Sequence, residues 1–336
     1  MKLLAGIIVA FGSLFLVFHT TVVDFVPTPE FPKSAEVVAE EKKPINIIFV
    51  GDVMLGRGVE GKYKQGDIFR NVSGVFSAAD AVVANLEGPI LNNHIKTPNN
   101  SYKFSFATTT LNILKFAGFT DLSLANNHTD NYGRDGYFET MLNLKSVGLN
   151  YFGDPNLISE YSVNKREISG KKFVFVGIND TYGNLTEGKI IELAKSTRAK
   201  FSGDFFSFVI HWGEEYEFAA NARQMRIGRG LIDAGVDLVI GSHPHVIQNI
   251  EKYNDKYIFY SLGNFVFDQY FSTSTQEGLV VNIKIKNEVE EIDLWPVISV
   301  KSVPEFLRGE ERATWLNNYS ETNKLIQSEI SAGILK

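Results

Sequence analysis

Residues 45–57 read INIIFVGDVMLGR, and this stretch decides the fold class. Its first seven residues are mostly apolar and rich in β-branched side chains, which is typical of a strand buried on both faces in an α/β sheet. The run ends at Gly51, and Asp52 follows where the strand meets its loop. In α/β sheets, ligands bind beyond the carboxyl ends of the strands. The stretch therefore predicts a buried strand with a functional carboxylate at its end.

The same pattern, a short apolar run that ends in a polar or glycine-containing cluster, recurs along the chain. It recurs as AVVAN (81–85), DLSLAN (121–126), FSFVIHWG (206–213) and VDLVIGS (236–242), with further runs at 171–178, 256–263 and 278–286. Spacings of three and four residues predict helices at Thr108–Phe116, Gly136–Val147 and Ala219–Asp233. Strands alternating with helices indicate an α/β protein. About ten strands are many for one open sheet, which favours two packed sheets flanked by helices.

The composition narrows the classes of protein. With 44% hydrophobic residues in a chain of 336, we expect a globular protein with a substantial core. The net charge of −6 argues against a dominant nucleic-acid partner, because such partners normally require a basic face. The sequence has no cysteine, which excludes disulfides, thiolate zinc sites and cysteine nucleophiles.

The N-terminal sequence predicts a membrane anchor. Residues 3–23 contain no charged residue, and as a helix they would rise about 31 Å, enough to cross a bilayer. Lys2 precedes this run and Asp24 follows it, so we expect a single pass in the cell membrane with the rest of the chain extracytoplasmic. A retained anchor is favoured over a cleaved signal segment, because the run is long and no clear A-x-A site follows. Residues 24–44 then form a flexible, proline-containing linker, 45–304 the main domain and 305–336 a C-terminal helical extension.

Candidate metal ligands follow five of the predicted strands. They are Asp52, Glu87, Asn127, His211, His243 and His245. Each alone has an ordinary structural explanation, such as a turn or a rigid loop, but five independent strand ends with a ligand-competent residue indicate a metal site. In an extended H-P-H segment, His243 and His245 would point into one cavity. The mixed donors suit Mn²⁺, Fe²⁺ or Zn²⁺, and their number indicates one or two ions.

Six motifs in a fixed order resemble the CapA family of poly-γ-glutamate capsule biosynthesis proteins. They are GDVMLGRGVE, VVANLEGPI, LANNHTDNYG, VIHWGEEYE, DAGVDLVIGSHPHVIQ and YSLGNFVFDQ, and they span about residues 45–300. That family is similar to a branch of the calcineurin-like metallophosphoesterases. The resemblance implies a four-layer αββα sandwich of two mixed sheets, association with the membrane, and a role in poly-γ-glutamate assembly or export.

The resemblance also implies residue roles. Asp52 matches the first ligand, Glu87 stands where a metal-bridging aspartate is usual, and Asn127, His211, His243 and His245 match later ligands. His128 matches a histidine on the catalytic side. Two positions depart from the superfamily pattern. Met54 replaces a ligand histidine, as is common in CapA-like proteins, and this weakens one of two metal positions. Asn131 stands where an aspartate is more frequent, with Asp130 one residue earlier.

Other polar residues in these motifs leave alternatives open. Arg57 is a candidate to grip an anionic group, or it forms a structural salt bridge. Glu214 either orients an imidazole or is an ordinary loop carboxylate. Asn264 and Asp268 are expected to fix their loop by hydrogen bonds.

Three functions fit the sequence. The first is a capsule-biosynthesis protein that acts with other capsule-synthesis membrane proteins on poly-γ-glutamate. The second is a metal-dependent phosphoesterase with a phosphate-bearing substrate, and the third is a non-catalytic scaffold stabilised by its metal. The chain has no G-x-x-x-x-G-K-[ST] loop, so it is not itself an ATP-dependent ligase of the P-loop type.

Overall fold

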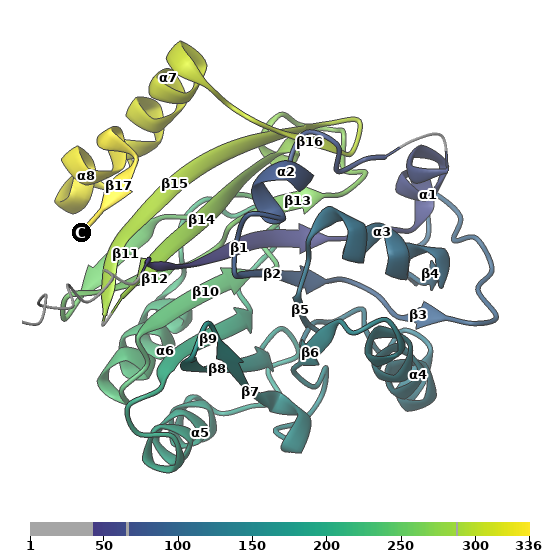
Figure 1. The fold of residues 1–336 in the computed structure, drawn as a ribbon, viewed down its shortest axis with the longest axis horizontal. Coiled ribbons are helices and arrows are strands. Elements are labelled where there is room, and N and C mark those ends of the chain that lie inside the picture. Colours follow the sequence, from purple (N-terminus) through teal and green to yellow (C-terminus); the bar gives the residue numbers. More distant parts are fainter. Residues whose placement is uncertain (1–42, 65–66, 287) are drawn as a thin grey trace, which may run out of the picture. The chain divides into compact units, whose positions relative to one another are not determined.

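Strand β1 (Ile45–Val53) lies inside a large mixed sheet, between β14 and β2. The computed structural model describes residues 43–64, 67–286 and 288–336. Within these residues the strands form a nine-stranded first sheet, a six-stranded second sheet and a two-stranded third one (Figure 1). The structure thus confirms an α/β protein with several sheets.

The first sheet has the order β16-β15-β14-β1-β2-β5-β6, with β13 paired to β1 and β17 to β15. Strands β1, β2, β5 and β6 are parallel, so their carboxyl ends share one edge. Besides β1, its strands are β2 (Ala81–Leu86), β5 (Asp121–Ser123), β6 (Asn150–Phe152), β13 (Asn264–Val266), β14 (Glu277–Ile285), β15 (Val289–Val300), β16 (Val303–Phe306) and β17 (Ile334–Leu335).

The second sheet has the order β11-β12-β10-β9-β8-β7, and its strands β8, β9, β10 and β12 are parallel. Its strands are β7 (Val163–Ile168), β8 (Lys171–Asn179), β9 (Phe205–His211), β10 (Leu238–Ser242), β11 (Ile250–Tyr253) and β12 (Lys256–Phe259). The small third sheet pairs β3 (Ile90–Leu91) with β4 (Phe106–Ala107).

Eight α-helices are found in the described residues, together with three short 3₁₀ turns. The helices are α1 (Arg57–Tyr63), α2 (Ser73–Phe76), α3 (Thr109–Ala117), α4 (Gly133–Ser146), α5 (Glu187–Lys200), α6 (Ala222–Asp233), α7 (Gly309–Ser320) and α8 (Gln327–Ala332). The three helices predicted from periodicity correspond to α3, α4 and α6, with ends that differ by at most three residues.

Three hydrophobic clusters hold these elements together in layers. The first joins helices α1–α4 to one face of the first sheet, through residues such as Ile48 and Leu114. The second lies between the sheets and includes Phe49 and Phe175, whose rings meet edge to face at 6.3 Å. The third packs α5 and α6 on the outer face of the second sheet, as Figure 1 shows. The segment after residue 304 also enters the second cluster, through α7, α8 and β17.

A bulge in β1 decides which layer Asp52 faces. Along β1, Ile48 and Val50 belong to the helix-covered cluster, so an even-numbered Asp52 would face the helices in a regular strand. However, the register with β2 passes from Phe49↔Val83 to Asp52↔Asn85, so two residues of β1 lie opposite one residue of β2 between these pairs. The extra residue reverses the alternation, because Val53 now joins the helix-covered cluster. Asp52 therefore faces the space between the sheets.

No helix within residues 43–64, 67–286 and 288–336 combines the length and the apolar character that a membrane span requires. The anchor predicted at residues 3–23 and most of the linker predicted at 24–44 lie outside the described residues.

Candidate metal centre

The predicted ligands gather where the parallel strands of both sheets end. In the first sheet Asp52 lies opposite Asn85, and in the second sheet His211 lies opposite Ser242. Glu87 follows β2, and the H-P-H segment follows β10. The buried, apolar strands fix these ends in place, so the polar side chains meet between the two sheets.

One cluster of ligand atoms comes from Asp52, Glu87 and His245. One ligand atom from each of the three lies within 4.8 Å of the others, and all three side chains are buried. Oδ2 of Asp52 lies 3.2 Å from Nδ1 of His245. It also accepts a hydrogen bond of 3.3 Å from the backbone N–H of His243. Asp52 is thus held against His243 and His245.

His211 links Glu87 to Asn127. Its Nε2 lies 3.0 Å from Oδ1 of Asn127 and 3.6 Å from Oε1 of Glu87. Its other ring nitrogen, Nδ1, lies 2.9 Å from Oγ of Ser242. A metal that binds Nε2 would leave Nδ1 to donate its proton to this hydroxyl, an arrangement that commonly fixes ligand histidines.

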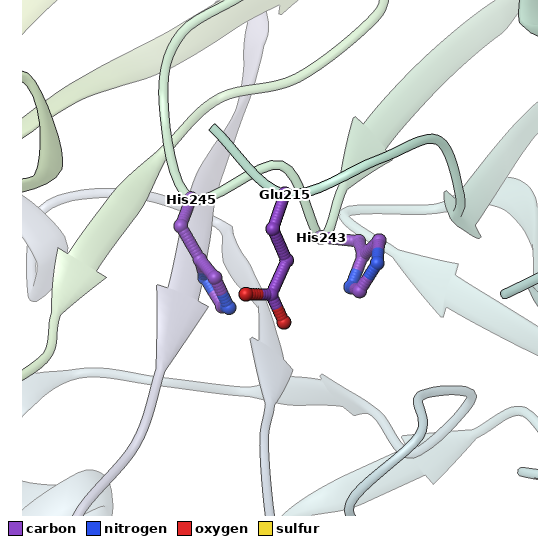
Figure 2. A group of neighbouring side chains, drawn as sticks. All are labelled: Glu215, His243 and His245. Atoms are coloured by element: carbon purple, nitrogen blue, oxygen red, sulfur yellow. The ribbon is translucent and has the colours of Figure 1, made fainter. Parts of the chain in front are cut away.

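His243 and His245 do not lie in the extended segment that the sequence predicts. Both have positive φ, 100° for His243 and 59° for His245, which costs a non-glycine residue about 1–3 kcal/mol. The two rings nevertheless stay 6.0 Å apart. Glu215 lies with them, and the three offer ligand atoms that are within 4.8 Å of one another (Figure 2). A strained turn, instead of strand alternation, brings the two imidazoles together.

The electrostatics of the site favour a bound cation. Burial raises the pKa of the Glu87 carboxyl well above its ordinary value, and the negative charges of Asp52 and Glu215 raise it further. Burial also lowers the pKa of His211 well below its ordinary value and that of His243 to about 3. At neutral pH the imidazoles of His211 and His243 are therefore uncharged, as metal ligands must be.

Two buried atoms strengthen this interpretation. Within the described part of the chain, Oε2 of Glu87 and Nδ1 of His243 are buried and have no hydrogen-bond partner. Such atoms cost free energy when they stay unpaired. Both belong to side chains that can bind a metal, so a bound ion would give them a partner. The carboxylate, amide and imidazole donors of the site fit a divalent ion of the Mn²⁺, Fe²⁺ or Zn²⁺ type.

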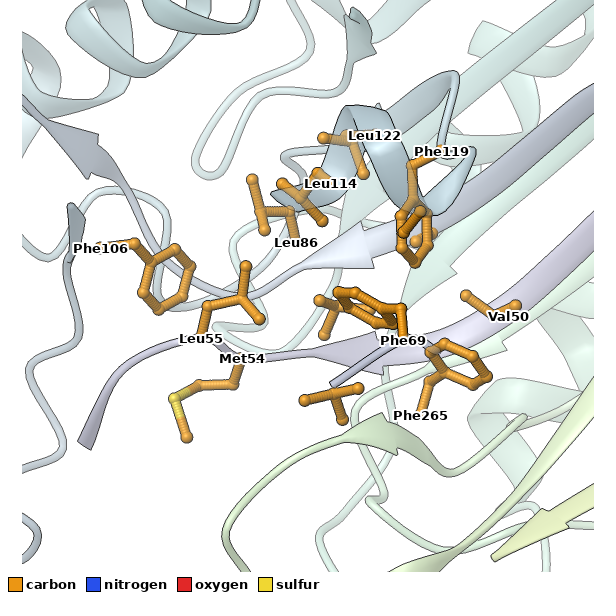
Figure 3. Packing of buried hydrophobic residues seen from close by; sticks show 14 of the residues in the cluster. Val50, Met54, Leu55, Phe69, Leu86, Phe106, Leu114, Phe119, Leu122 and Phe265 are labelled. Carbon is orange, nitrogen blue, oxygen red and sulfur yellow. The ribbon is translucent and has the colours of Figure 1, made fainter. Parts of the chain in front are cut away.

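Met54 offers the site no comparable donor. It is fully buried in the helix-covered hydrophobic cluster, near Leu55 in Figure 3. Its sulfur lies 3.1 Å from the backbone nitrogen of Gly56, which uses it as a hydrogen-bond acceptor. A thioether is a poor ligand for hard or borderline ions. The cluster of Asp52, Glu87 and His245 therefore receives no further donor from Met54.

His128 lies beside the site and pairs with Asn131. Its Nδ1 is 3.2 Å from Oδ1 of Asn131, which also accepts a hydrogen bond from the Phe104 N–H. Its ring packs on that of Phe104, with 4.1 Å between centroids. Burial lowers the pKa of His128 to about 4. Asp130 instead accepts a hydrogen bond from Asn156, so asparagine is the partner of His128 here.

Arg57 has its charge paired inside the protein. Its guanidinium forms a salt bridge with Asp268, and both side chains are less than a tenth exposed. The group also lies over the rings of Phe104 and Phe267, at 4.8 and 5.4 Å. Of the two alternatives for Arg57, the structure contains the salt bridge. Asp268 fixes this loop as expected, since it also accepts from the N–H of Gly58.

Four residues of the site were not predicted as part of it. Asn85 points its amide nitrogen at Oδ1 of Asp52 (2.8 Å), Oε1 of Glu87 (3.2 Å) and Nδ1 of His211 (3.2 Å). Asn264 places its Oδ1 3.0 Å from Nδ1 of His245, in addition to fixing its loop. The other two are Ser242 and Glu215. For Asn85 a signal exists, because it lies two residues before Glu87, a spacing that points both side chains the same way in an extended chain.

A cavity of about 540 Å³ lies elsewhere, at the amino ends of β9 and β10, beside Phe205 and Leu238. None of the candidate ligands lines it. The candidate metal centre is therefore identified by its ligand side chains and not by this cavity.

The comparisons with known proteins agree with the motif resemblance. The family model of the bacterial capsule synthesis protein PGA_cap matches residues 46–269, which include all six predicted ligands. The capsule biosynthesis protein CapA of Bacillus anthracis is 33% identical over 269 residues, which are 73% of this chain and 65% of that protein. The PGA biosynthesis protein CapA of Bacillus subtilis (strain 168) is 33% identical over 275 residues, 76% of this chain and 72% of that protein. The aligned part of the chain thus spans slightly less than two thirds of the first relative's length.

A solved structure shares the fold. The crystal structure of a hypothetical protein from Thermus thermophilus superposes with a TM-score of 0.51 at 14% identity. The match covers 75% of this chain and 98% of that one.

Proposed function

The chain belongs to the PGA_cap family of bacterial capsule synthesis proteins, and from this premise we propose that it acts in the assembly or export of a poly-γ-glutamate capsule through a divalent metal centre. One observation carries the metal centre. Ligand-type side chains from the ends of strands in both sheets converge there, and they leave Oε2 of Glu87 and Nδ1 of His243 buried without a partner among the described residues.

We assign the ligands to two positions that share Glu87. Asn127, His211 and His243 join Glu87 at the first position, which has the full ligand set of the superfamily. Asp52 and His245 join Glu87 at the second position, from which Met54 is missing. We further propose that the fold is a metallophosphoesterase-type αββα sandwich. The layers of helices and sheets and the order of the ligands along the chain support this.

A second candidate function is metal-dependent hydrolysis of a phosphoester. Two bound metal ions would supply Lewis acidity for the attacking and leaving oxygens. His128 is the residue whose placement favours this candidate. Its Nδ1 faces Oδ1 of Asn131, and the tautomer with its proton on Nδ1 would leave the lone pair of Nε2 free. Burial lowers the pKa of His128 to about 4, so in the metal-free protein its imidazole is neutral at neutral pH and could accept a proton.

The cellular setting is part of the proposal. Residues 3–23 would anchor the chain in the cell membrane by a single pass, and the described residues would lie outside. There the protein would meet nascent poly-γ-glutamate and the other capsule-synthesis membrane proteins. An ATP-dependent ligase among those proteins would form the amide bonds.

The proposal is tested on the purified full chain by elemental analysis of bound metal and by assays on generic phosphomonoesters and phosphodiesters. We expect bound Mn, Fe or Zn in the wild type and its loss in His243→Ala. His94→Gln changes a histidine outside the site and should keep the metal. Absence of any transition metal, even after titration, would overturn the metal centre. Metal binding without phosphoesterase activity would reject the hydrolase and leave the capsule or scaffold role.

The capsule role has its own test. Deletion of the gene in its host should abolish or reduce cell-associated poly-γ-glutamate, and the full chain should restore it. Because the metal centre is proposed to serve this role, His243→Ala should fail to restore the polymer. If His243→Ala restores the polymer at the same protein level as the wild type, capsule synthesis does not depend on the metal centre.

A further inference from the structure

Glu215 is an exposed carboxylate, yet it lies over the candidate centre. Figure 2 shows its carboxylate between the imidazoles of His243 and His245, and its ligand atom is within 4.8 Å of theirs. Donors bound at about 2.0–2.2 Å to one ion are at most about 4.4 Å apart. Glu215 therefore lies close enough to reach an ion held by His245 after a small movement of its side chain.

Two tethers hold the loop of Glu215 in this place. The N–H of the next residue, Tyr216, donates a hydrogen bond of 2.8 Å to the carbonyl of Pro244, between the two histidines. The Tyr216 hydroxyl accepts from Gln269 at 3.1 Å, and Gln269 in turn accepts from Asn264, the partner of His245. The loop of Glu215 and the turn that contains His243 and His245 are thus joined by hydrogen bonds.

The start of the loop depends on glycine. Gly213 has φ of 85°, and a Cβ there would lie 2.7 Å from the buried amide of Gln224. The chain therefore turns back sharply after His211 and Trp212, a conformation that glycine adopts without strain. This turn carries Glu215 over the site, whereas its neighbour Glu214 belongs to neither ligand cluster.

We propose that Glu215 is a further metal ligand, which supplies from the second sheet the donor that Met54 does not supply from the first. The inference rests on the metal centre proposed above. Asp52, Glu87 and His245 alone give an ion three protein donors, and Glu215 makes four. The Glu215 carboxylate also adds a negative charge, which a divalent cation would neutralise. Binding of the ion would then also hold the loop of Glu215 against the turn that contains His243 and His245.

The test measures metal binding directly. The full chain is stripped with a chelator, and Mn²⁺ binding is followed by isothermal titration calorimetry for wild type, Glu215→Gln and Glu214→Gln. Loss of a residue that only orients a ligand costs about 10- to 100-fold in metal affinity, so we expect Glu215→Gln to weaken the affected ion at least about tenfold. The matched control Glu214→Gln should bind like the wild type.

A compensating substitution makes the test specific. Met54→His restores the missing donor of the first sheet, so it should return Mn²⁺ affinity to Glu215→Gln if both residues serve the same ion. Because Met54 is buried, the thermal midpoint of each metal-free variant is compared first. If Met54→His does not fold, the comparison of Glu215→Gln with Glu214→Gln decides the inference by itself.

The possible outcomes separate this inference from the function on which it rests. Wild-type chain that binds no Mn²⁺ overturns both. If the wild type binds and His243→Ala does not, but Glu215→Gln titrates like Glu214→Gln, the metal centre stands and the role of Glu215 is rejected. Selective loss in Glu215→Gln supports it.

Discussion

Asn85 donates a hydrogen bond from its amide nitrogen to Oδ1 of Asp52 over 2.8 Å, and the two residues face each other in register on β2 and β1. The carbonyl oxygen of the same amide accepts from Asn126, which fixes which way the group points. The amide nitrogen therefore lies among Asp52, Glu87 and His211. One neutral side chain thus orients the carboxylates of Asp52 and Glu87 beside His211 before any ion binds.

Replacement of Asn85 by alanine should weaken metal binding. Without the amide, the carboxylates of Asp52 and Glu87 lose the donor that separates and orients them. We expect a loss of affinity of about 10- to 100-fold, as for other residues that orient ligands. Titration of the chelator-stripped chain measures it, and an unchanged dissociation constant would contradict this role of Asn85.

Replacement of Ser242 by alanine should have a similar but smaller effect, about tenfold. Its hydroxyl faces Nδ1 of His211, and without it the tautomer that exposes Nε2 to the metal is less favoured. Ser207→Ala is the matched control. Ser207 lies on β9, the strand of His211, is fully buried, and its hydroxyl has no hydrogen-bond partner in the described residues. If both serines behave alike, Ser242 does not position His211.

The metal-free protein should lose stability in acid partly through His243. Its folded pKa of about 3 lies below the ordinary value near 6.5, so between these values the unfolded chain binds the extra proton. Stability from this group is present above about pH 6.5 and falls by about 1.4 kcal/mol per pH unit as the pH decreases toward 3. Glu87 acts in the opposite direction, since its raised pKa lets the folded state take up a proton first.

A difference measurement isolates the contribution of His243. Urea unfolding of wild type and His243→Ala is compared from about pH 7 to about pH 4.5 with chelator present, a range that lies largely between the two pKa values. The wild type should lose more unfolding free energy over this range than the variant does. Parallel curves for the two proteins would mean that His243 is not held neutral by burial.

Replacement of Asp268 by asparagine should destabilise the fold without removing the metal. The substitution leaves the buried guanidinium of Arg57 without its anion, which typically costs about 3–5 kcal/mol. Glu187→Gln is the control, because it breaks an exposed pair with Arg226 and should change stability little. Denaturant midpoints and Mn²⁺ titration are measured on both. Lost metal affinity with unchanged stability would place Arg57 and Asp268 in the site itself.

The sequence identified the elements whose signal is local. The apolar runs that became β1, β2, β9 and β10 end in the residues that gather at the site, because buried parallel strands bring their ends to one edge. Strand β15 was missed, since VEEIDLWPVISV mixes charges and a proline into its apolar residues. Such a strand is recognised by its long pairing with β14, which is not local information.

The details of the site depended on geometry that no local pattern contains. The bulge that turns Asp52 inward arises from the pairing of β1 with β2, and alternation alone would have aimed this residue at the helices. Glu214 and Glu215 are equivalent in sequence terms, and only the turn at Gly213 and the Tyr216–Pro244 hydrogen bond select the second. The partner of Arg57 lies 211 residues away along the chain.

Anomalous diffraction would locate the bound ions in the crystal. Crystals of the full chain grown with Mn²⁺ would be measured on both sides of the manganese absorption edge. We predict an anomalous peak bounded by Glu87, Asn127, His211 and His243, with a second, weaker peak beside Asp52, His245 and Glu215. No anomalous peak within bonding distance of these side chains, at a Mn²⁺ concentration that saturates binding in solution, would contradict the account.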